Sequence, residues 1–292
     1  MTLLLSVLEQ GLIYAILALG VYITFKILDF PDMTVDSSFP LGAAVTALMM
    51  TKGISPLLTI PASMLAGALA GVLTGVIHVR LKVRDLLSGI IVMTGLYSVN
   101  LHIAGRSNVQ LFMNDTIFKN PLVSSLSFEM QTYVPVIILA ALTLLAKVLM
   151  DLYLATRSGF LLRATGDNPT LVSTLAKDSG SVKILGLAIA NALVALSGCI
   201  MCQYQRYFDI SMGTGTLVLA VASVIVGTQL LKGLRFLRAT TAVVLGSILY
   251  KGCVALALNF GLSPFDLKLV TAALLLIIIV LGSDRKKVKR RA

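Results

Sequence analysis

The chain has 292 residues, of which 57% are hydrophobic and 13% charged, and its mean hydropathy is +0.94. A soluble domain of this length could not bury so much apolar surface, so the composition indicates an all-α polytopic membrane protein. The net charge of +11 does not indicate nucleic-acid binding, because Lys and Arg cluster in short loops and in the C-terminal tail, as the positive-inside rule describes.

The first half of the chain contains five apolar stretches. The first, Leu3–Ile27, lacks the basic start and the cleavage site of a signal peptide, so we expect it to be retained as a span. A polar, proline-containing break, Asp29–Pro40, precedes a short second stretch. The remaining stretches predict spans at Phe39–Met50, Pro56–Val79, Leu86–Ala104 and Tyr133–Leu154. In the third stretch, four-residue spacing of Gly67, Gly71 and Gly75 predicts close helix packing, within one subunit or between two.

The second half contains four more apolar stretches and a second polar break, Gln203–Thr216. The predicted spans are Ile184–Cys202, Leu217–Leu231, Thr240–Leu258 and Leu267–Leu281. The expected total is therefore about nine transmembrane helices, within a range of eight to ten. They form a transmembrane domain over residues 1–283, followed by a basic cytoplasmic tail at 284–292.

Basic residues predict the orientation of these spans. Cytoplasmic connectors are rich in Lys and Arg, and the basic segments here are Lys26, Arg80–Arg84, Arg157–Lys183, Lys232–Arg238 and the tail. Placing all of them in the cytoplasm requires an odd number of spans, with the N-terminus outside and the C-terminus inside.

The sequence also contains a weak internal repeat. Gly11–Gly20 is similar to Gly186–Gly198, and each is followed by a polar break and a short apolar segment. The predicted orientation makes the halves, about 1–155 and 184–283, inverted relative to one another. Inverted repeats in transporters place a substrate path at the repeat interface.

The longest polar interval with clear helix signals is Arg157–Lys183. Asn168 is a good N-cap, Pro169 suits the first helical position, and Asp167 adds negative charge at the helix start. We therefore expect a short helix at about Pro169–Lys177 that ends at Gly180. On these residues alone the interval could be either a docking surface for a partner or an ordinary connector on the bilayer.

The residues leave several function classes open and weaken others. The chain lacks a Gly-x-x-x-x-Gly-Lys-Ser/Thr motif for ATP, and its two His and three Cys residues form no metal or catalytic pattern, so we expect no enzyme, metal or cofactor here. An ion-coupled transporter would place charges at mid-bilayer. Asp29, Asp32 and Asp36 could hold a cation, whereas Glu9, Lys26, Lys251 and Lys268 lie near predicted span ends, where charged heads can reach water.

Three stretches carry a resemblance to a known family. They are Leu28–Ala44, then Arg163–Asn168 with Ala176 and Gly180, and then Phe208–Gly227. Together they resemble the permease subunits of ATP-binding-cassette importers of the branched-chain amino acid and simple-sugar type. The Asp-Phe-Pro-Asp sequence at 29–32 departs from the branched-chain form and is more similar to a subgroup linked with aromatic amino acid uptake.

The resemblance implies partners for this chain. A permease dimer would work with two ATPase subunits, which carry ATP and Mg, and with an external binding protein, in a bacterial cell membrane. The interval 157–183 would then be the coupling segment. Its contacts with the ATPase are expected from Arg163, Gly166, Asp167, Asn168, Leu171, Val172, Leu175 and Ala176.

The two polar breaks are the candidates for the translocation path. Irregular backbone at membrane depth is tolerated where protein or a water-filled cavity satisfies it. The expected path residues are Asp32, Thr34, Asp36 and Ser38 toward the cytoplasm, and Gln205, Tyr207 and Asp209 toward the outside. Arg206 is expected to dock the binding protein. The alternatives are that both breaks are ordinary surface loops, and that the substrate is a sugar or a nucleoside.

Overall fold

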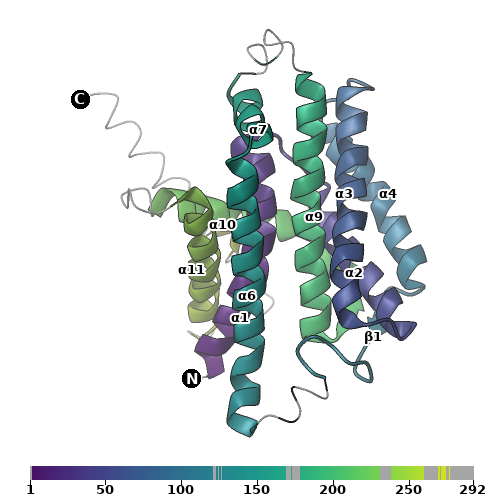
Figure 1. Ribbon diagram of the computed structural model, residues 1–292, viewed down its shortest axis with the longest axis vertical. Helices are drawn as coiled ribbons and strands as arrows, with labels where there is room; N and C mark the ends of the chain where they lie inside the picture. Colours follow the sequence, from purple (N-terminus) through teal and green to yellow (C-terminus); the bar gives the residue numbers. More distant parts are fainter. Residues whose placement is uncertain are drawn as a thin grey trace.

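Long apolar helices run along the long axis of the molecule and form a single bundle (Figure 1). The structure is a computed structural model that describes residues 2–120, 123, 125, 127–168, 172, 178–230, 238–259, 269, 271–273 and 276. Because lipid supplies no hydrogen bonds, helices are the elements expected of such apolar segments. The prediction of an all-helical membrane fold is confirmed.

The first half of the chain begins with α1 (Thr2–Val21), which continues as a π-helical turn, η1 (Tyr22–Ile27). The elements that follow are α2 (Val35–Thr51), α3 (Pro56–Val79), α4 (Asp85–Ala104), the short strand β1 (Asn108–Gln110) and α6 (Phe128–Leu154). Helix α3 has the predicted bounds, since Pro56 suits a helix start and basic residues follow its end.

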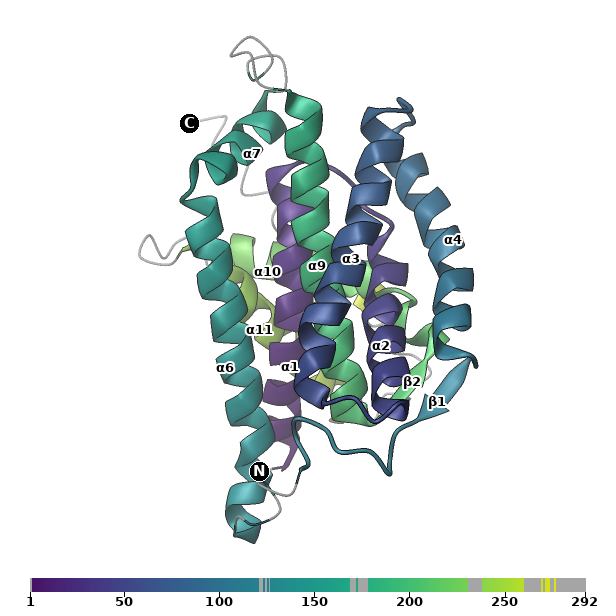
Figure 2. The same ribbon diagram turned by 45° about the vertical axis from the view of Figure 1, so that its right-hand side comes forward.

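The second half contains α7 (Arg157–Asp167) and α9 (Ser179–Gln205). The next elements are the strand β2 (Tyr207–Asp209), the 3₁₀ turn η2 (Ile210–Gly213), α10 (Thr216–Leu230) and α11 (Ala239–Asn259). Helices α7 and η1 lie at one end of the bundle, and β1 and β2 at the other (Figures 1 and 2). We call these the α7 end and the strand end.

The described residues contain seven helices that are long and apolar enough to cross a membrane. Helix α2 corresponds to the short second predicted span, but its 17 residues leave it outside that group. Most of the expected ninth span, Leu267–Leu281, lies outside the described residues, as does the basic tail. The expected count of nine is therefore not confirmed, and the inverted repeat stays a prediction.

Helix α9 lies at the centre of the bundle, between α1, α2 and α3 (Figure 2). The glycine stripe of α3 packs on it: a Cβ at Gly67 or Gly71 would collide with the backbone of Asn191 or Leu187. Gly75 likewise lies against Ile184. The stripe therefore serves packing within one subunit, where small residues let two backbones approach closely.

The segment between α6 and α9 differs from the prediction. Residues Arg157–Asp167, expected as a connector, form α7, because Thr156 caps its start by accepting a hydrogen bond from the Gly159 amide. Gly180 does not end a helix but lies in the first turn of α9, whose N-cap is Asp178. Of the expected helix at 169–177, only Val172 is among the described residues, and it is helical.

Candidate functional site

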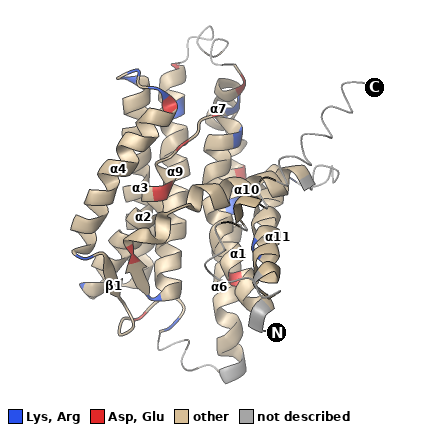
Figure 3. Ribbon diagram, turned by 180° about the vertical axis from the view of Figure 1, so that it is seen from behind, with Lys and Arg blue, Asp and Glu red and all other residues tan. Residues whose placement is uncertain are grey.

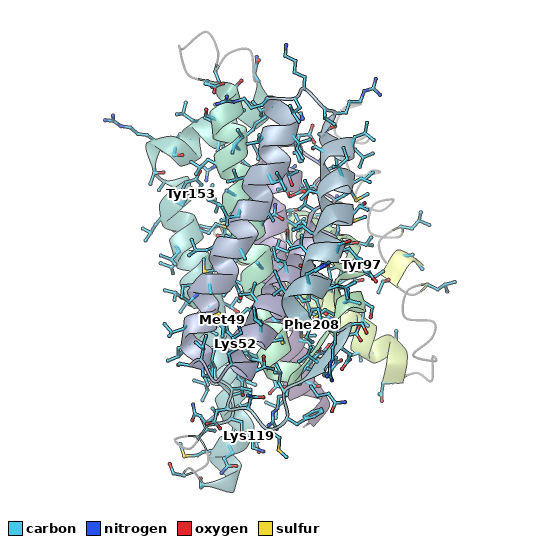
Figure 4. The ribbon with its side chains drawn as sticks, turned by 90° about the vertical axis from the view of Figure 1, so that its right-hand side faces the viewer. Met49, Lys52, Tyr97, Lys119, Tyr153 and Phe208 are labelled. Atoms are coloured by element: carbon cyan, nitrogen blue, oxygen red, sulfur yellow. The ribbon has the colours of Figure 1, made fainter. Side chains whose placement is uncertain are left out.

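The two strands join segments that are far apart in the sequence. β1 and β2 pair antiparallel, with Asn108 opposite Asp209 and Gln110 opposite Tyr207. Phe208 points into the core and is fully buried. In Figure 4 it lies toward the same end as Lys52 and Lys119, while Tyr153 lies near the α7 end. The loop after α4 is thus fixed to the second polar break, which the sequence did not predict.

Asp209 lies at the end of this strand pair. Its carboxylate accepts hydrogen bonds from the Ser211 amide (2.8 Å) and hydroxyl, and from Asn108 Nδ2 (3.1 Å). These bonds, those from Ser211 first, hold the pKa of Asp209 below its ordinary value. Asp209 is therefore ionised at neutral pH and acts as the cap of η2.

Arg206, between α9 and β2, has left-handed backbone geometry (φ 61°). Its guanidinium donates a hydrogen bond to the Phe112 carbonyl and lies 5.8 Å from the centroid of the Phe112 ring. Met113, next along the loop, is completely exposed. Arg206 thus holds an exposed apolar loop tip at the strand end, where a partner could bind.

A second contact at this end was not anticipated from the sequence. The Tyr204 hydroxyl donates a 2.6 Å hydrogen bond to Glu9 Oε2, and the Phe118 ring packs edge-on against Tyr204. These residues come from α9, α1 and the loop after β1, so the contact depends on how the three segments meet. The sequence signal was only an acidic residue early in an apolar span.

Most of the first polar break is buried rather than open, although Asp29 is exposed. Asp32 is 1% exposed, and its carboxylate accepts hydrogen bonds from the Thr34 amide (2.9 Å) and Asn191 Nδ2 (2.8 Å). Thr34 is also hydrogen bonded to Thr74, at 2.8 Å between the hydroxyl oxygens. Asp32 and Thr34 therefore tie the break to α9 and α3 in this conformation.

Asp36 connects the two breaks directly. Its carboxylate accepts hydrogen bonds from the Leu217 amide (2.8 Å), the Thr216 hydroxyl (3.1 Å) and the Gly215 amide (3.2 Å). It therefore lies at the N-terminus of α10, where a negative charge is favourable. Asp36 and Ser38 belong to helix α2 rather than to a non-helical break, and the Ser38 hydroxyl is fully buried without a hydrogen-bond partner.

The three carboxylates considered for a cation have separate surroundings. Asp29 is exposed with a left-handed backbone (φ 52°), while Asp32 is bound to Asn191 and Asp36 to α10. Within the described part of the chain, no group of three His, Cys, Asp or Glu residues could hold a metal ion. The geometry does not favour a cation site in the first break.

Lys251 lies further from the end of its helix than the snorkelling interpretation requires. It lies about two turns before the end of α11. Its Nζ is 4.0 Å from the centroid of the Tyr14 ring and 3.4 Å from Gln10 Oε1. Snorkelling at a span end therefore does not describe it. The available signal was its distance of about two turns from the end of the predicted span Thr240–Leu258.

The predicted coupling residues lie at the α7 end, so far as the structure describes them. Arg163, Asp167 and Asn168 are exposed, and Gly166 packs so closely on η1 that a Cβ would collide with the Ile27 carbonyl. Asp167 ends α7 rather than starting the next helix. Val172 is fully buried. Leu171, Leu175 and Ala176 lie outside the described residues.

Comparison with known sequences gives three findings. Residues 3–280 match the family model described as "Branched-chain amino acid transport system / permease component". The chain is 42% identical to a tyrosine transport system permease protein of Clostridioides difficile (strain R20291), over 98% of this chain and 93% of that protein. It is 32% identical to the uncharacterized protein RP368 of Rickettsia prowazekii (strain Madrid E), over 95% and 96% respectively.

A solved structure shares the fold. A chain of PsaBC from Streptococcus pneumoniae in complex with Fab superimposes with a TM-score of 0.54 at 12% identity. The match covers 98% of this chain and 94% of that chain. At this identity the likeness concerns the arrangement of helices alone.

Proposed function

The chain belongs to the family of permease components of branched-chain amino acid transport systems, and on this premise we propose that it carries tyrosine or a similar aromatic amino acid across the membrane. The observation that carries the substrate is the 42% identity to a tyrosine transport system permease over nearly the whole chain. The permease is the non-catalytic component of an ABC-type importer, with ATP and Mg bound by a separate ATPase.

The charge distribution supports an orientation in a bacterial cell membrane. Basic residues gather at the α7 end, on the loop between α3 and α4 and on α7 (Figure 3). The described members of this set are Lys26, Arg80, Lys82, Arg84, Arg157, Arg163, Lys183 and Arg238. Fewer basic residues lie at the strand end, so we assign the α7 end to the cytoplasm and the N-terminus to the outside.

We assign the ATPase subunits to the α7 end. Arg163, Asp167 and Asn168 are exposed there, beside the segment that the family resemblance identifies as the coupling segment. Close packing of Gly166 on η1 joins this segment to the end of α1. A force on α7 would therefore reach α1 directly. A second permease copy completes the membrane part of the importer.

The external binding protein docks at the strand end, on the loop tip that Arg206 holds. From there the path passes Gln205, Tyr207 and Asp209 and continues along the contact between the two breaks. Asp36 bridges α2 and α10 at this contact. Since Asp32, Thr34 and Ser38 are buried in this conformation, they line the path only after these helices separate.

Uptake by the reconstituted importer tests the function. The permease, its ATPase and its binding protein are placed in vesicles with ATP on the ATPase side, and uptake of radiolabelled tyrosine, leucine, ribose and a nucleoside is measured. We expect ATP-dependent uptake of tyrosine, with leucine, ribose and the nucleoside at background. Uptake of ribose or a nucleoside alone would exclude an amino acid as the substrate. Uptake driven by an ion gradient without ATP would contradict the assignment to an ATP-driven importer.

A further inference from the structure

Lys251 is a half-buried cation without a carboxylate partner among the described residues. The ion pairs found there join Asp151 to Lys147 and to Arg238. Lys251 instead approaches the Tyr14 ring (4.0 Å) and, at 3.4 Å, Gln10 Oε1. A ring face and one amide oxygen stabilise an ammonium less than a carboxylate does. Ionisable groups within transmembrane helices commonly mark a substrate or ion path.

The direction of the side chain separates Lys251 from an interfacial lysine. A snorkelling lysine directs its ammonium to the nearer membrane surface, which for Lys251 is at the strand end. Its ammonium instead lies over Tyr14, one turn further than Gln10 toward the α7 end. The ammonium is therefore held against α1 rather than directed toward the nearer end of α11.

A cleft of about 380 Å³ lies beside this ammonium. Its lining residues come from α1 and α11 and are Ser6, Val7, Gln10, Lys251, Val254, Ala255 and Asn259. This volume is within the range of small-molecule sites. Polar and apolar side chains share the walls, which suits a ligand with a charged group and an apolar body.

The wall behind the cleft leads to the contact between the two breaks. The Tyr14 ring, below the ammonium, stacks on Phe39 of α2 with 6.2 Å between centroids and 5° between planes. Phe39 is fully buried and lies one turn after Asp36, which holds the start of α10. The stacked Tyr14 and Phe39 rings thus connect a ligand bound at Lys251 to α2, the helix whose Asp36 contacts α10.

We propose that Lys251 binds the carboxylate of the amino acid in transit, with Gln10 and the Tyr14 ring beside it. The inference rests on the proposed function and adds the residue that recognises the acid group within the membrane. The ammonium would exchange a weak partner for a carboxylate, which charge-assisted hydrogen bonds favour. Release follows when α1 and α11 move relative to one another.

Neutral and charged replacements of Lys251 test this in the reconstituted importer. We expect Lys251→Met and Lys251→Gln to lower ATP-dependent tyrosine uptake about tenfold, the effect of losing one charge-assisted contact. Lys251→Arg, which keeps the charge, should retain a substantial part. The matched control is Lys52→Met, which removes an exposed charge at the strand end. Thermal melting and co-purification with the ATPase should be unchanged in all four variants.

Each outcome decides the matter. Equal uptake by Lys251→Met and Lys52→Met would overturn the proposal while leaving the proposed function intact. Failure of the wild type to take up any amino acid would remove the proposed function, and this inference with it. If the Met variant does not assemble, the comparison of Gln with Arg separates loss of charge from loss of packing.

A lipid phosphate is the other anion that could reach Lys251. Repeating the uptake in vesicles with and without phosphatidylglycerol distinguishes the two. We expect the Lys251→Met defect in both. A defect confined to vesicles that contain the anionic lipid would assign the cleft to a headgroup and overturn the proposal.

Discussion

At the scale of single residues, Asp36 caps a helix that begins far along the chain. Its carboxylate receives the Leu217 amide, 181 residues later, and the Gly215 amide. Replacing Asp36 with Ala leaves these amides at the start of α10 without their acceptor, which typically costs about 1 kcal/mol. We expect Asp36→Ala to lower the melting temperature in detergent by a few degrees and to slow transport modestly. Asp115→Ala, which removes an exposed loop carboxylate, is the control, and equal melting of the two variants would contradict the capping role.

At the scale of elements, the contact between α3 and α9 depends on the absence of side chains along one stripe. A Cβ at Gly71 would collide with the Leu187 carbonyl, whereas a Cβ at Gly95 of α4 would meet nothing within 4 Å. We therefore expect Gly71→Ala to destabilise the bundle by about 1–3 kcal/mol, as overpacking does, and Gly95→Ala to stabilise it slightly, because Ala favours a helix more than Gly does. Thermal unfolding of both variants measures the difference. A stable Gly71→Ala protein would show that α3 and α9 can separate at little cost.

At the scale of the whole molecule, transport requires the α7 end to pass a force from a partner to the spans. We expect the double variant Leu171→Asp, Leu175→Asp to assemble in the membrane but to separate ATP hydrolysis from uptake, because charges replace the apolar face predicted to dock into the ATPase. ATP hydrolysis and tyrosine uptake are measured together in the complete importer. The control is Arg84→Ala, which removes an exposed charge at the same end but outside the coupling segment. Unchanged coupling in the double variant would contradict the docking role.

The sequence by itself determined the class of protein and most helix positions. The bounds of α3 were predicted to the residue, and those of α4 nearly so, as were those of α1 once η1 is counted with it. The physical reason is that a helix in lipid satisfies its own backbone, so that length, hydropathy and end signals suffice to place it. The breaks were located as well, although Asp36 and Ser38 proved helical.

Only the tertiary structure decided which distant groups meet. The pairing of β1 with β2, the cap that Asp36 gives to α10, the packing of Gly71 on Leu187 and the position of Lys251 over Tyr14 each join segments far apart in the chain. Such contacts depend on the rotation and depth of whole helices, and these are set by packing between their faces. The periodicity of one segment carries no record of the face that it meets.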